Sequence, residues 1–229
     1  MDLWMTPIES DEMIPLTSGS DLDWHPRWSP DGKEVAFYSS RTGRREVFVM
    51  PLGGGPAVQL TSGESDDTEF FYPQWSPDGN EIAFAARRGR AAIHVVPRDG
   101  GATRFVFESE SREELHAAWS SDGRWLMFAS NQSLWRVPAE GGEPERLTEG
   151  VNNWPIPSRD GKRVFFPGFG ERLGNIWAFT LEDQSERPMT DLKGRYGSLR
   201  IQAVTDGRYL YFGWAEDLGD IWVMDVAAE

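Results

Sequence analysis

The sequence predicts an all-β fold in which one four-stranded antiparallel sheet is repeated along the chain. Two observations lead to this prediction. An Asp-Gly pair recurs at five equivalent positions, at intervals of 47, 44, 38 and 46 residues, and no stretch between these positions has the periodicity of a helix. The pairs are Asp31-Gly32, Asp78-Gly79, Asp122-Gly123, Asp160-Gly161 and Asp206-Gly207. Repeats of about 44 residues with four strands each are typical of β-propeller blades.

Each repeat opens with a short strand that leads into a tight turn. The first three copies read WSPDGKEVAF (28–37), WSPDGNEIAF (75–84) and WSSDGRWLMF (119–128). The last two copies have Pro157 and Ala203 in place of the tryptophan. Glycine accepts a positive φ and aspartate bonds its local backbone, so the Asp-Gly pair predicts the turn between the first two strands.

The rest of each repeat predicts three more strands. The second strand alternates as in Glu34–Ser39, and the third is VFVM (47–50), IHVV (93–96), LWRV (134–137), IWAF (176–179) or IWVM (221–224). Glycine-rich turns at 53–55, 100–101 and 141–142 lead to a fourth strand, which ends in Leu60-Thr61 or Leu147-Thr148.

We therefore expect one domain over residues 1–229, built from five blades, with an incomplete six-bladed ring as the alternative. The chain stops soon after a third strand, and residues 1–17 have the pattern of a third and a fourth strand. Residues Met13–Thr17 are accordingly expected to pair beside Ile221–Met224 and to close the ring, which would remove two exposed sheet edges.

Composition excludes several classes of protein. The 229 residues include no cysteine, so thiolate metal sites and cysteine nucleophiles are impossible. A formal net charge of −14 opposes a nucleic-acid partner, and no apolar run is long enough for a membrane span. The motifs G-x-S-x-G, H-E-x-x-H and G-x-x-x-x-G-K-[ST] are absent. We expect a monomer that is not an enzyme and holds no cofactor or metal, cytoplasmic if Met1 is the natural start, with the periplasm open otherwise.

Candidate binding residues come from positions that differ between the repeats. Six residues before each Asp-Gly pair the chain enters the innermost strand, and blade symmetry would bring these five positions to one channel entrance. We call them the mouth positions: His25, Tyr72, His116, Trp154 and Arg200. The loops between second and third strands share this face and carry what we call the rim arginines: Arg41, Arg45, Arg87 and Arg88. Arginine suits carboxylates, and the aromatic residues suit stacking.

The repeat W-S-P-D-G-x-x-[VI]-A-F, followed by an aromatic strand and by G-G-x-P-x-x-L-T at 141–148, resembles that of TolB-type, WD-repeat-like β-propellers. The same repeat occurs in propeller domains of prolyl-oligopeptidase-type and tricorn-type peptidases, in oligogalacturonate lyases and in bacterial sensor proteins. The resemblance covers essentially the whole chain and implies a fold more than a function.

Three functions follow as expectations. The first is a non-catalytic binding module whose protein or peptide partner, or small anionic ligand, occupies the mouth face. The alternative is an accessory propeller of a prolyl-oligopeptidase-like or tricorn-like peptidase. The second alternative is a metal-dependent enzyme of the oligogalacturonate-lyase type, for which the resemblance implies metal-binding histidines; His25 and His116 share a suitable phase in the repeat.

Overall fold

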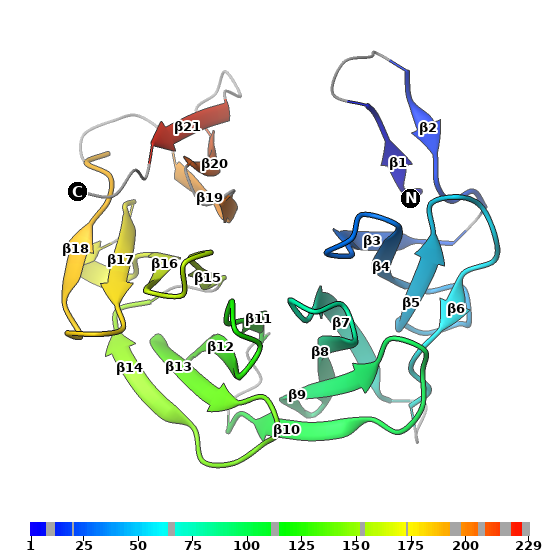
Figure 1. Cartoon of the computed structure of the whole chain (residues 1–229), viewed down its shortest axis with the longest axis horizontal. Helices are drawn as coiled ribbons and strands as arrows, with labels where there is room; N and C mark the ends of the chain where they lie inside the picture. The colour runs from blue at the N-terminus through cyan, green and yellow to red at the C-terminus, as the bar shows by residue number, and fades with distance from the viewer. Residues whose placement is uncertain are drawn as a thin grey trace. The chain divides into compact units, whose positions relative to one another are not determined.

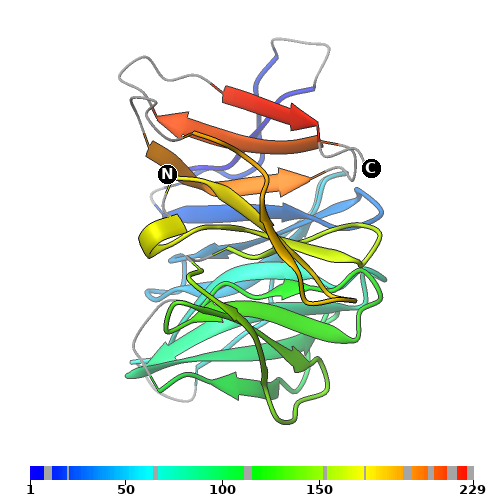
Figure 2. The same cartoon turned by 90° about the vertical axis from the view of Figure 1, so that its left-hand side faces the viewer.

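The computed structural model describes residues 1–7, 12–19, 21–63, 67–110, 115–151, 154–172, 174–192, 198–205, 209–215 and 221–225. The chain divides into two compact units, Met1–Glu114 and Leu115–Glu229. Each unit is built from sheets of consecutive antiparallel strands (Figures 1 and 2). No helix among the described residues is long and apolar enough to span a membrane.

The first unit contains two four-stranded sheets, and in each of them the strands are neighbours in sequence order. Strand β7 of the second sheet packs against β3, β4 and β5 of the first. The first sheet consists of β3 (Asp23–Trp28), β4 (Glu34–Ser39), β5 (Glu46–Pro51) and β6 (Val58–Gln59). The second consists of β7 (Glu69–Trp75), β8 (Glu81–Arg88), β9 (Arg90–Pro97) and β10 (Arg104–Glu108).

The second unit contains two four-stranded sheets and one of three strands. The four-stranded sheets are β11 (Ala118–Trp119), β12 (Trp125–Ser130), β13 (Ser133–Pro138) and β14 (Glu145–Glu149), then β15 (Ile156–Pro157), β16 (Arg163–Pro167), β17 (Ile176–Thr180) and β18 (Glu186–Pro188). The last sheet is β19 (Ser198–Thr205), β20 (Tyr209–Ala215) and β21 (Ile221–Asp225). The predicted propeller blade of four antiparallel strands is thus confirmed in four repeats.

The N-terminal strands form a hairpin. Strands β1 (Trp4–Met5) and β2 (Ile14–Pro15) pair with each other, and within the described residues of the second unit β21 pairs with β20. That residues Met13–Thr17 pair beside Ile221–Met224 and close the ring stays a prediction. The backbone N–H of Leu16 donates to the carbonyl of Leu3 at 2.8 Å, and Leu3 is buried in the core of the first sheet. Pairing two nearby segments closes a short loop, which costs little chain entropy.

The predicted Asp-Gly turns depend on a serine for which the repeat pattern predicted no role. In each of four turns the serine Oγ donates to the aspartate Oδ1 at 2.6 Å: Ser29 to Asp31, Ser76 to Asp78, Ser120 to Asp122 and Ser158 to Asp160. The same Oγ accepts the backbone N–H five residues further on, at 2.9–3.0 Å. The glycines adopt φ of 70–75°. These contacts lower the pKa of each aspartate, that of Asp122 to about 2. The turn at Asp206 lies outside the described residues.

The repeated tryptophans do not share one environment. Trp75 is 9% exposed, and its Nε1 donates to the carbonyl oxygen of Arg27 in the neighbouring sheet at 2.9 Å. Trp119 is equally buried, whereas Trp28 is 52% exposed. Trp75 therefore joins the first two sheets through both apolar contact and a hydrogen bond.

Candidate functional site

Three mouth positions have a backbone conformation that is unusual for residues with side chains. His25, Tyr72 and Trp154 lie in the left-handed region, with φ of 50°, 54° and 71°. In β3 the pairing skips from Trp24 to Arg27, so His25 belongs to a bulge in which two residues oppose one. A non-glycine residue in this region costs of order 1–3 kcal/mol, and such strain is concentrated at functional sites.

Related irregularities occur in two other strands. In β7 the pairing skips from Phe71 to Gln74, again with two residues opposite one, and in β19 it skips from Leu199 to Ala203, with three residues opposite one. The second of these bulges includes Arg200, whose side chain lies outside the described part of the chain. A sequence signal was available, because His25, Tyr72 and Trp154 each precede a proline, which has no N–H for the sheet ladder.

In the first unit the bulges bring His25 and Tyr72 into an aromatic cluster. The ring of His25 lies edge-on to that of Tyr72, with 4.8 Å between their centroids, and stacks on Tyr38 at 5.5 Å. Tyr38 also stacks on Trp24 at 5.3 Å and meets Phe71 edge-on at 5.6 Å. Tyr38 and Phe71 are buried, while the other three rings are partly accessible. The cluster thus presents three rings on a buried aromatic base.

Two rim arginines lie against this cluster. The guanidinium of Arg45 lies 5.2 Å from the ring centroid of Phe71, and that of Arg87 lies 5.0 Å from it. Both also face the carboxylate of Glu69, at 3.6 Å and 3.1 Å. Their charges are therefore partly compensated within the protein, and both side chains order the aromatic surface.

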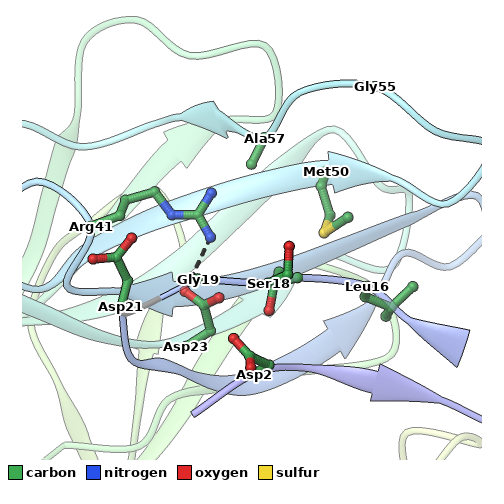
Figure 3. A pocket seen from close by; sticks show the side chains of 11 residues that line it. Asp2, Leu16, Ser18, Gly19, Asp21, Asp23, Arg41, Met50, Gly55 and Ala57 are labelled. Atoms are coloured by element: carbon green, nitrogen blue, oxygen red, sulfur yellow. Dashed lines mark hydrogen bonds and ion pairs between the residues drawn. The ribbon is translucent and has the colours of Figure 1, made fainter. Parts of the chain in front are cut away.

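Arg41 is similarly occupied. Its Nη2 lies 3.0 Å from Oδ1 of Asp23, a carboxyl group that is almost fully buried, and its guanidinium lies 4.7 Å from the ring centroid of Phe48. Figure 3 shows this pair in a pocket of about 200 Å³ that also contains Asp2 and Asp21. Because Arg41 is needed to compensate Asp23, its main role in this structure is to hold the first sheet together.

Arg88 differs from the other rim arginines. It is exposed at the tip of the β8–β9 hairpin, where it pairs across the strands with Arg90. Arg90 lies 3.4 Å from a carboxylate oxygen of Glu108, whereas no described residue forms an ion pair with Arg88. Arg88 is thus the rim arginine whose charge is available to a ligand.

In the second unit, His116 and Trp154 are in contact. Their ring centroids lie 3.6 Å apart with the planes inclined by 29°, and His116 is only 5% exposed. The structure thus joins four of the five mouth residues in two pairs, one in each unit. That all five surround one entrance stays a prediction. Among the described residues, no three side chains of the types His, Cys, Asp or Glu form a group that could hold a metal ion.

Comparison with known proteins shows that this repeat is that of a known family. Residues 2–153 match the model of the TolB beta propeller domain. The chain belongs to this family. The TolB-type repeat inferred from the W-S-P-D-G pattern is therefore confirmed. The matched residues include the first four-stranded sheet, β3–β6.

Relatives of this TolB-like chain include peptidases as well as TolB itself. It is 29% identical over 98% of its length to "Tricorn protease homolog 1" of Streptomyces coelicolor, of which it covers 22%. It is 36% identical over 83% of its length to "Tol-Pal system protein TolB" of Anaeromyxobacter dehalogenans, of which it covers 35%. The chain thus spans about a fifth to a third of these two relatives.

Solved structures show the same fold. TolB from Acinetobacter baumannii aligns with 98% of the chain and 57% of its own, at a TM-score of 0.76 and 19% identity. A puromycin-hydrolyzing peptidase from Mycobacterium tuberculosis aligns with 97% of the chain and 38% of its own, at a TM-score of 0.72 and 20% identity. At these identities the similarity establishes the propeller fold alone.

Proposed function

We propose that this chain is a non-catalytic binding module that holds a protein or peptide partner at the mouth positions. The observation that carries the proposal is the left-handed backbone of His25, Tyr72 and Trp154. Sterics favour glycine at such positions, yet each carries a large ring. The strained backbone costs stability at equivalent positions of three repeats. A binding role for the aromatic rings explains why glycine does not occupy these positions.

The chemistry of the cluster favours stacking over charge. His25, Tyr72 and Trp24 are partly accessible, and Arg45 and Arg87 are partly compensated by Glu69. Such a surface suits the flat faces of proline and aromatic side chains in an extended peptide, as in other aromatic-lined peptide grooves. Arg200 is proposed to bind an anionic group of the same partner at the entrance. In the full proposal the three-stranded sheet is the fifth blade of a ring, with an incomplete six-bladed ring as the alternative.

The proposal is tested by selecting peptides from a random displayed library on the whole chain. Selected peptides should lose about five- to thirtyfold in affinity on Tyr72→Ala and on Trp154→Ala, because a stacked ring contributes about 1–2 kcal/mol. Arg124→Gln is the matched control, since Arg124 is exposed beside the Asp122 turn, remote in the repeat from the mouth. Peptides that bind both mouth variants as well as the unchanged chain would contradict the proposal.

A second candidate function is an accessory propeller of a tricorn-like peptidase. It is favoured by the alignment of 98% of the chain with 22% of a tricorn protease homolog. In that case the native polypeptide would be several times larger than 25.9 kDa. Immunoblotting of source-cell extract with an antibody against the chain decides between a band of that larger size and one near the mass of this chain.

A further inference from the structure

A cleft of about 350 Å³ lies in the first unit, outside the aromatic cluster. One wall is the segment Thr61–Gly63 that follows β6, and the other is the outer part of the second sheet, from Phe70 on β7 to Phe105 on β10. Deeper on the same face of the second sheet, Ile82, Phe84 and Val96 pack against the first sheet as part of the core. The cleft therefore begins where the contact between these two sheets ends.

The cleft exists because two small residues lie opposite each other. Ala86 on β8 pairs with Ala92 on β9. Ala86 lies eight residues after Asp78, as Ser39 lies eight residues after Asp31 in the first sheet. The equivalent pair in the first sheet is Ser39 with Glu46, and Glu46 is fully buried, with its carboxylate accepting from Thr61 Oγ1 at 2.5 Å. The second sheet has two methyl groups where the first has a buried carboxylate, so the space stays open.

The walls around this alanine floor are aromatic. Phe70 pairs with Ala86 from one side, and His94, next on the same face, pairs with Phe105. The ring of His94 stacks on Phe84 at 5.7 Å, and burial lowers its pKa, which keeps the imidazole neutral at pH 7. Phe105 is 56% exposed and lies edge-on to His94 at 5.6 Å. A flat apolar body would cover the floor and bury the free face of Phe105.

The open end of this cleft is lined by arginine side chains. The hairpin of β8 and β9 continues beyond the alanine pair to Arg88 and Arg90, and both line the cleft. Glu108, also a lining residue, compensates Arg90, while Arg88 has no ion-pair partner among the described residues. The net charge of these three groups is +1, in a chain whose net charge is −14. The local charge thus selects one anionic group beside the apolar slot.

We propose that this cleft binds a small aromatic carboxylate, with its ring on Ala86 and Ala92 and its carboxylate on Arg88. The site goes beyond the proposed function, because it shares no aromatic residue with the mouth and does not depend on a partner there. Its volume falls within the usual range for small-molecule pockets.

The test is calorimetric titration of the whole chain with N-acetyl-tryptophan and with its uncharged amide. The carboxylate should bind with a Kd below about 1 mM, and the amide about tenfold more weakly, because it lacks the charge that Arg88 recognises. Arg88→Gln should reduce the difference between the two probes to near zero. Arg187→Gln, which removes an exposed arginine from β18, is the matched control and should leave both affinities unchanged.

Filling the cleft provides an independent arm. Ala92→Leu should abolish binding. If the leucine variant does not fold, Phe105→Ala serves as the test, because Phe105 is at an exposed position that tolerates truncation, and this variant should bind the carboxylate more weakly. Tyr72→Ala should leave binding unchanged, which separates this site from the mouth. Equal binding of acid and amide, binding unaffected by Arg88→Gln, or no saturation by about 10 mM would each overturn the proposal.

Discussion

Replacing Trp75 by alanine should cost far more stability than the same replacement at Trp28, although both tryptophans occupy the same position of the repeat. Trp75 is 9% exposed and Trp28 is 52% exposed. Full burial of a tryptophan removes about 150–250 Å² from water, worth an upper estimate of about 4–6 kcal/mol. Trp75→Ala also removes the donor to the carbonyl of Arg27, a bond worth about 1 kcal/mol.

We therefore expect Trp75→Ala to lower the free energy of unfolding by about 4 kcal/mol and Trp28→Ala by about 1–2 kcal/mol. Urea unfolding followed by far-ultraviolet circular dichroism measures both without relying on tryptophan fluorescence. Trp75→Phe, which keeps most of the apolar contact but not the donor, should lie between wild type and Trp75→Ala. Equal losses for the two alanine variants would refute the reasoning, because Trp28 would then be as well covered in solution as Trp75.

Three further predictions concern single side chains. The pKa of Asp122 is lowered to about 2, chiefly by the Ser120 hydroxyl. The carboxylate therefore contributes fully to the stability of the fold above its unfolded pKa near 3.8, and this contribution is lost as the pH falls toward 2. The Tm difference between wild type and Asp122→Asn should accordingly shrink over that pH interval. Glu46→Ala should cost about 3 kcal/mol in urea unfolding, because it leaves Arg44 without the buried carboxylate that lies 2.7 Å away, and a loss below 1 kcal/mol would contradict this. Gln184→Gly should raise the Tm, since Gln184 is exposed with φ of 56° and glycine removes about 1 kcal/mol of backbone strain; an unchanged or lower Tm would show that the strain is absent.

The blades follow from local patterns in the sequence. The Asp-Gly turns and the alternating strands lie within about twenty residues of one another, and β3–β4–β5 form in the predicted order. The repeat also predicts which residues occupy equivalent positions, among them His25 and Tyr72, whose rings are in contact in the structure. Their left-handed backbone was missed, although the prolines that follow them were visible in the sequence.

Which charges stay uncompensated and where space remains depend on the packing of the folded chain. Arg41, Arg45 and Arg88 look alike in the sequence, yet the first two meet Asp23 and Glu69, residues of other strands, and the third meets no described carboxylate. The expected pairing of residues 13–17 with 221–224 joins two distant parts of the chain and stays a prediction, whereas β1 and β2 pair locally. The cleft above Ala86 and Ala92 depends on what a neighbouring sheet leaves unfilled, and packing between sheets is a property of the folded chain that no local pattern encodes.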